Sequence, residues 1–202
     1  MLQSTITRAF ALGLGYGTLW LVSACIAFGI LDMVEINTTL AGSVLSILVT
    51  LLIGGILLFL CLRFLRLGYA LPKTEDGKIS PIGRRIFGLL ILLEIIGWTV
   101  LNIGLGSHKL QVWIVPIDLL IIAIHFIPLA FVFKVPAYLV MGICWVTAII
   151  GSMLVLPSTM VIGHSSAWTT IPSICCILLT WLTALYLIMT ESRKVRAVFQ
   201  TI

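Results

Sequence analysis

The sequence predicts an all-α integral membrane protein, a single domain over residues 1–202 that forms a six-helix transmembrane bundle. Hydrophobic residues make up 61% of the chain and charged residues only 9%, whereas about a quarter of a soluble domain is charged. Several uncharged runs exceed the roughly 20 residues needed to cross a bilayer core. The basic residues gather in alternate connections between these runs, as in polytopic membrane proteins.

The first expected helix, 9–31, is a retained span, because its apolar run is longer than the roughly 7–15 residues of a secretion signal. The second run follows after a very short polar loop. The remaining polar stretch of any length is 63–85, which we expect to be a cytoplasmic connector, with docking of a partner as the alternative. The later helices are expected at about 40–62, 86–106, 113–133, 136–156 and 168–190.

Charge orients the bundle. Every Lys and Arg except Lys109 falls on the side that holds both termini and the 63–85 loop. By the positive-inside rule this side is cytoplasmic. Aromatic residues fit the same orientation, with Trp113 and Trp168 expected at the outer interface and Tyr138 and Tyr186 near the inner one.

The first helix carries small residues at four-residue spacing, Ala9, Gly13 and Gly17, with Ala11 and Gly15 on a neighbouring face. Small residues let two helices approach closely in lipid. Gly13 and Gly17 are therefore the expected packing positions, either inside the monomer or between two copies of the chain.

Three ionisable residues lie within the expected spans: Glu94, Asp118 and His125. A charge at mid-bilayer costs about 2.5–3.5 kcal/mol on insertion scales, so these groups should point into the bundle. Glu94 and His125 each lie eight residues from the cytoplasmic end of their helix, about 12 Å deep. Because a short loop joins these helices, we expect the two side chains to meet.

A second polar pair follows the same reasoning. Asn102 and Asp118 match in depth nearer the outer side, and each returns to nearly the same helix face as Glu94 or His125. Trp98 lies between the polar residues of the third helix. The sequence therefore predicts a polar seam between the third and fourth helices, whose members are candidates for binding a proton, an ion or a ligand.

Each of these residues also has a structural interpretation. Asp118 could cap the first turn of its helix. Pro128 frees the carbonyl of Ile124 and predicts a kink, and His125 could donate to that carbonyl. Glu94 has no such local role, so a proton or cation site at Glu94 and His125 and a purely structural tie both stay open.

The sequence lacks the residues that a metal site, a nucleophilic enzyme or a phosphate-binding loop would need. A metal site needs three or more ligands, and His125 is the one histidine at membrane depth. The five cysteines suit apolar packing, and no activated nucleophile or glycine-rich phosphate loop is evident. We expect no enzyme activity, no cofactor and no nucleic-acid partner, because topology accounts for the basic residues.

The segment from His125 to Ala130, His-Phe-Ile-Pro-Leu-Ala, followed by Lys134 and Pro136, resembles a segment of uncharacterised small bacterial multi-pass membrane proteins. This resemblance implies a bacterial inner membrane and carries no activity with it. The chain is also similar in size to the six-helix substrate-binding components of vitamin transporters, without their motifs.

Two functional hypotheses follow. The first is a small transporter or solute-binding protein with a protonatable intramembrane site, whose partners are the lipid bilayer and an unknown small solute or proton. The alternative is a non-transporting scaffold or sensor that binds a protein partner or lipid.

Overall fold

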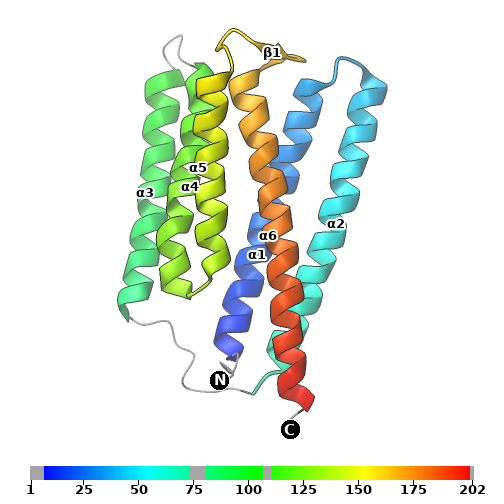
Figure 1. Cartoon of the computed structure of the whole chain (residues 1–202), viewed down its shortest axis with the longest axis vertical. Helices are drawn as coiled ribbons and strands as arrows, with labels where there is room; N and C mark the ends of the chain where they lie inside the picture. Colours follow the sequence, from blue (N-terminus) through cyan, green and yellow to red (C-terminus); the bar gives the residue numbers. More distant parts are fainter. Residues whose placement is uncertain (1–6, 73–80, 107–110, 201–202) are drawn as a thin grey trace.

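In the computed structural model of the chain, residues 7–72, 81–106 and 111–200 are described. They form six long helices that run side by side along the length of the molecule (Figure 1). A short 3-10 helix, η2, and a two-residue antiparallel pair of strands, β1 and β2, lie in the connections. The elements are α1 (Arg8–Ile36), α2 (Leu40–Ala70), α3 (Pro81–Gly106), η2 (Gln111–Trp113), α4 (Ile114–Phe133), α5 (Pro136–Val155), β1 (Val161–Ile162), β2 (Ser165–Ser166) and α6 (Ala167–Gln200).

The all-α fold class is confirmed. In the described part of the chain, α1, α2, α4, α5 and the stretch Ala167–Val198 of α6 are long and apolar enough to cross a membrane. The length and apolar composition of these five helices identify the chain as a membrane protein. The sixth long helix, α3, has 26 residues.

Local sequence signals explain where the helices begin. The Thr7 side chain accepts a hydrogen bond from the Phe10 N–H at the start of α1, and Thr39 accepts one from the Gly42 N–H at the start of α2. Threonine is a favourable N-cap because it satisfies a backbone donor that has no helical partner. Pro136 occupies the first turn of α5, where its missing N–H costs nothing.

Several helices are longer than predicted. α2 continues to Ala70 and α3 already begins at Pro81, so the expected 63–85 loop is wrong for residues 63–70 and 81–85. α1 and α6 likewise extend beyond their predicted ends, to Ile36 and Gln200. Hydropathy marks the apolar width of a bilayer, whereas backbone hydrogen bonds continue a helix into polar surroundings.

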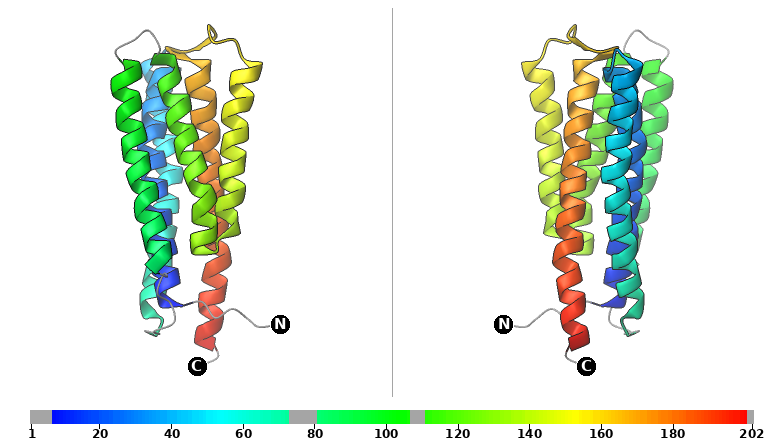
Figure 2. Two further views of the ribbon diagram at one scale, coloured as in Figure 1. Left: turned by 90° about the vertical axis from the view of Figure 1, so that its left-hand side faces the viewer. Right: turned by 90° about the vertical axis from the view of Figure 1, so that its right-hand side faces the viewer.

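The helices pack in a fixed order of neighbours. α1 packs on α2 and α6, α5 packs between α4 and α6, and α3 packs chiefly on α4. Figures 1 and 2 show α3 at one edge of the bundle, beside α4. The shared core includes Val22, Phe64, Ala123 and Ile149, all almost fully buried. α3 is therefore the helix with the least protein around it among those described.

The close approach of α1 and α2 occurs on a different face from the predicted one. A methyl group on Gly13 would have nothing within 4 Å, and one on Gly17 would make only an ordinary contact with the Tyr138 hydroxyl. At Gly15 the same methyl would lie 2.6 Å from Leu65 Cδ2, and Ala11 on this face is fully buried. The prediction that Gly13 is a packing position within the monomer is thus wrong.

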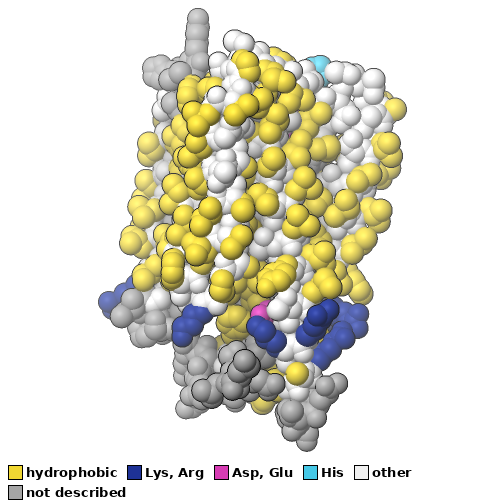
Figure 3. All heavy atoms as spheres, in the orientation of Figure 1, with side chains coloured by type: hydrophobic (Ala, Val, Ile, Leu, Met, Phe, Trp, Pro, Cys, Tyr) yellow, Lys and Arg dark blue, Asp and Glu magenta, His cyan; other side chains and the backbone are white. Residues whose placement is uncertain are grey.

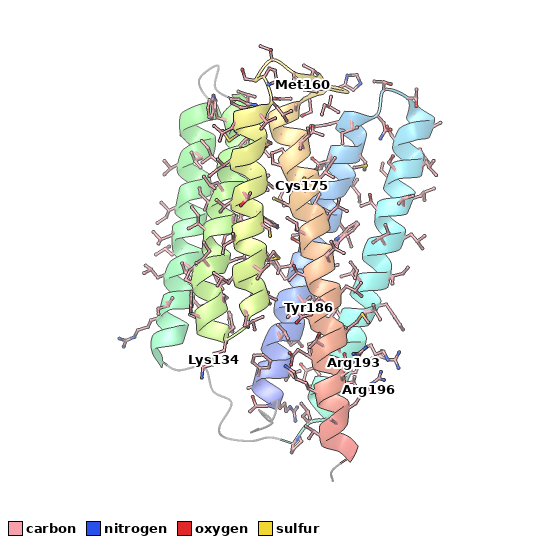
Figure 4. All side chains as sticks on the ribbon, in the orientation of Figure 1. Lys134, Met160, Cys175, Tyr186, Arg193 and Arg196 are labelled. Atoms are coloured by element: carbon pink, nitrogen blue, oxygen red, sulfur yellow. The ribbon has the colours of Figure 1, made fainter. Side chains whose placement is uncertain are left out.

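Charge and aromatic residues mark the two ends of the bundle. The basic side chains seen in Figure 3 gather at the end that holds both termini. Figure 4 shows Lys134, Arg193 and Arg196 at this end and Met160 at the opposite one. Trp113 and Trp168 stack edge to face, with ring centroids 5.0 Å apart. Tyr138 lies in the first turn of α5, and its side chain is buried against the protein.

Candidate functional site

The inner face of α3 is a narrow stripe directed at α4. Between residues 85 and 100 the half-buried side chains are Leu90, Glu94 and Gly97, and Leu101 continues the spacing. Steps of four, three and four residues are the repeat by which two helices share a seam. Every other described side chain from 85 to 100 is exposed. Glu94 therefore lies in the middle of the α3–α4 seam.

Glu94 meets His125 in this seam, as their matched depths predict. Glu94 Oε2 lies 3.1 Å from His125 Nδ1, and the two side chains are 27% and 11% exposed. The Phe87 and Phe133 rings pack edge to face on one side of the pair, with centroids 5.8 Å apart. The structure thus brings together an acid and a base from two helices.

A glycine allows α3 to come close to α4 beside the pair. A methyl group on Gly97 would lie 3.2 Å from Ile121 Cδ1, which is tighter than most side-chain contacts. Gly97 is one turn beyond Glu94 on the same stripe. Its lack of a side chain lets the helices approach where the carboxyl group must reach across the seam.

The Glu94–His125 pair is a close contact without a directed hydrogen bond. The two atoms are within ion-pair distance, yet Nδ1 makes no hydrogen bond that satisfies the direction of the ring N–H. Charge-assisted hydrogen bonds owe their strength to alignment as well as to charge. A misaligned pair is easier to separate, and its ring and carboxyl can each turn to another partner.

The other predicted members of the seam lie differently. Asp118 is the fifth residue of α4, and the first turn of this helix holds no acidic residue, so the N-cap interpretation of Asp118 is wrong. The turn Gln111–Trp113 precedes the helix, which begins at Ile114. Asp118 is half-buried. The Asn102 side chain lies outside the described residues, and so does its expected meeting with Asp118.

Trp98 borders the seam from outside. Its side chain is 58% exposed, four residues beyond Glu94 on the exposed side of α3. Pro128 is half-buried, and α4 continues through it from Ile114 to Phe133. The Nδ1 atom of His125 faces Glu94 rather than the carbonyl that Pro128 frees. The kink at Pro128 stays a prediction.

Two polar contacts between helices are not predicted by the sequence analysis. One joins the Tyr16 and Tyr69 hydroxyls of α1 and α2 at 2.6 Å. In the other, the Ser173 hydroxyl of α6 donates to Asp32 Oδ2 of α1 at 2.5 Å. Asp32 falls one residue beyond the first predicted helix, 9–31, whereas α1 extends to Ile36. A usable signal exists, because Asp32 continues the spacing of the buried residues Val22, Cys25 and Gly29.

A groove of about 350 Å³ opens between α1, α2 and α6, away from the Glu94–His125 pair. Its lining is almost entirely apolar and includes Val49, Ile53, Ile177 and Leu178. A groove of this character matches lipid chains rather than a polar substrate. The pair between α3 and α4 is therefore the stronger candidate for chemistry.

The pair is suited to holding a proton or a cation. A carboxyl and an imidazole can pass a proton between them, and a carboxylate can accept a positively charged group in place of the imidazolium. Within residues 7–72, 81–106 and 111–200, no group of three or more metal-ligating side chains comes together.

Fold and site together define an all-α membrane protein with an acid–base pair between two of its helices. No family model, curated protein or solved structure matches the chain.

Proposed function

We propose that this is a small transport or solute-binding membrane protein whose protonatable site is the Glu94–His125 pair. The proposal includes six membrane spans, with α3 as the third, both termini in the cytoplasm, and a bacterial cell membrane as the location. The alternation of basic and apolar segments supports the orientation, because Lys and Arg are retained on the cytoplasmic side. The position of α3 beside α4 supports the sixth span.

The 3.1 Å contact between Glu94 and His125 carries the proposal. His125 is eight residues from the end of α4 at Phe133, about 12 Å along the helix. Ionisable groups at such depth are costly, and they commonly mark ion or proton pathways. The contacts that flank the pair are apolar, between Phe87 and Phe133 and between Gly97 and Ile121, so α3 has other means of packing on α4.

The two residues have complementary roles in this function. Glu94 offers the negative charge that attracts a proton or cation, and its partly exposed carboxyl is the accessible member of the pair. His125 is the more buried member and supplies a positive charge that can be withdrawn when its proton leaves. Loading and release at Glu94 would then be coupled to the protonation of His125.

Proton flux in reconstituted vesicles tests the proposal. Vesicles enclose a pH-sensitive dye, and a potassium diffusion potential drives protons inward. We expect Glu94→Gln to reduce the wild-type flux by about tenfold or more, because positioned acid–base groups contribute at least this much to proton transfer. The matched control is Glu35→Gln, at an exposed position near the end of α1, which should keep the flux. Wild-type flux equal to that of empty vesicles would contradict the proposal.

The alternative is a scaffold or sensor, favoured by the broad apolar surface of α3. Leu92, Leu93, Ile96 and Val100 are each about half exposed or more, and such a surface can hold a second membrane protein. A photo-crosslinking residue at position 92 or 93 tests this function in cells. One defined protein adduct, together with absent proton flux, would favour the alternative, whereas adducts with lipid alone would count against it.

A further inference from the structure

We propose that the Glu94–His125 site binds a lipophilic organic cation, which enters sideways from the bilayer and rests between the Glu94 carboxylate and the Trp98 ring. This inference rests on the proposed function and assigns a ligand class to its site. It is argued from access, from the chemistry of the two exposed side chains, and from the competing charge of His125.

The open side of Glu94 faces the lipid. More than a quarter of its side chain is exposed, although α3 packs on α4 along the same stripe. The residues around it on the outer surface of α3 are Ile91, Ile95 and Trp98, and all three are exposed and apolar. A strongly hydrated ion would lose its water on this route, whereas an apolar cation dissolved in the membrane would not.

Trp98 supplies the second half of a cation site. Side chains four residues apart on a helix are surface neighbours, so the indole of Trp98 and the carboxylate of Glu94 border the same patch. A cation is attracted to the face of an aromatic ring, most strongly to Trp, and more so where water is excluded. A carboxylate beside an exposed Trp therefore selects a ligand that is both positively charged and apolar.

His125 determines when the ligand can bind. When His125 carries a proton, its positive charge competes with an organic cation for the Glu94 carboxylate 3.1 Å away, so binding of the organic cation favours loss of that proton. By reciprocity, a proton on His125 lowers the affinity for the organic cation by the same factor. This competition gives exchange of one proton for one organic cation.

Few other charged groups can interfere. On α3 and α4 the remaining described ones are Arg85, Asp118 and Lys134, each seven or more residues from the pair, hence about 10 Å or more along its helix. The helices behind α4 bring only uncharged or thiol and phenol groups towards its level. These are Tyr138 and Cys144 of α5 and Cys175, Cys176 and Tyr186 of α6. The charged residues of α6 follow Tyr186 in the sequence, and Figure 4 shows two of them, Arg193 and Arg196, near the end that holds the termini.

Equilibrium dialysis with tetraphenylphosphonium tests the inference on the whole protein in lipid nanodiscs. Tetraphenylborate, of nearly the same shape and apolarity but opposite charge, is the control ligand. We expect saturable binding of the phosphonium only. Glu94→Gln should weaken it by about tenfold or more and Trp98→Ala by about fivefold, Trp98→Phe should retain most of it, and Trp20→Ala, an exposed tryptophan of α1, should leave it unchanged.

His125→Gln distinguishes a competing charge from a merely structural role. It should bind the phosphonium at least as tightly as the wild type, and it should lose the proton release that a pH dye detects when the wild type binds. Equal binding of both ions, or equal phosphonium binding by Glu94→Gln and wild type, would overturn the inference. Wild-type proton flux without phosphonium binding would overturn the ligand class and leave the proposed function standing, whereas absence of both would overturn the two together.

Discussion

Ser173 donates a hydrogen bond to Asp32 and thereby joins the last helix to the C-terminal end of the first, over an oxygen–oxygen distance of 2.5 Å. Ser173 is buried and Asp32 half-buried. At the same end of the bundle the His164 N–H donates to the Glu35 carbonyl at 2.8 Å. The end of α1 is thus held by α6 and by the strand pair that precedes it.

Replacing Ser173 by Ala should destabilise the protein by about 1–2 kcal/mol, because a hydrogen bond to a carboxylate is lost and its acceptor stays at the interface. For a chain of this length each kcal/mol corresponds to roughly 2–4 °C in Tm. Thermal unfolding in detergent measures the change. Ser23→Ala is the control, since its exposed hydroxyl bonds only to Leu19 of its own helix. Equal Tm changes for the two variants would contradict a tie between helices.

Gly142→Ala should lower stability through the α4–α5 contact. A methyl group at Gly142 would lie 2.9 Å from the Ala123 carbonyl oxygen, and backbone cannot move aside as a side chain can. Overpacking of this kind costs about 1–3 kcal/mol. Gly151 in the same helix has nothing within 4 Å of the added methyl, so Gly151→Ala should keep or raise the Tm. The prediction fails if both variants unfold at the wild-type temperature.

Gly15→Ala and Gly13→Ala form a second matched pair, now in α1. The added methyl meets the buried Leu65 side chain at Gly15 and open space at Gly13. We expect a Tm loss of a few degrees for Gly15→Ala alone, corresponding to about 1 kcal/mol or more. Contact between two copies through the first helix also stays a prediction. A change of oligomeric mass on Gly13→Leu, measured by light scattering, would support it, and an unchanged mass would count against it.

The sequence predicts well the position of a residue along its helix. Five of the six helices begin within one residue of their expected positions, whereas α3 begins at Pro81, ahead of the expected residue 86. Glu94 meets His125 as predicted, although Glu94 lies farther from the observed start of α3 than the eight residues assumed. The two residues match in distance from the connection between the helices, since Glu94 is 12 residues before Gly106 and His125 is 11 after Ile114. This works because α3 and α4 are consecutive and antiparallel, so rise per residue alone aligns their side chains. Composition and charge then supply the class of protein.

The rotation of each helix about its own axis is harder to predict from the sequence. α1 is apolar on every side, so nothing in its pattern tells whether the Gly13 or the Gly15 face turns towards α2. In water a polar face would settle the rotation, whereas in lipid close packing of small residues does so. The place of Asp32 was hard to predict for a related reason, since it lies near the end of α1, which extends beyond the apolar run.

The central claim is that the Glu94–His125 pair serves binding or proton exchange and is not a structural tie. Thermal stability of wild type, Glu94→Gln, His125→Gln and the double variant, measured in one lipid or detergent, tests it most directly. We expect each single change to alter stability by no more than about 1 kcal/mol, with additive effects, because a carboxyl or an imidazole that loses its partner can become neutral. A loss of about 3 kcal/mol or more in each single variant, with no further loss in the double variant, would contradict the claim and show that the pair holds α3 to α4.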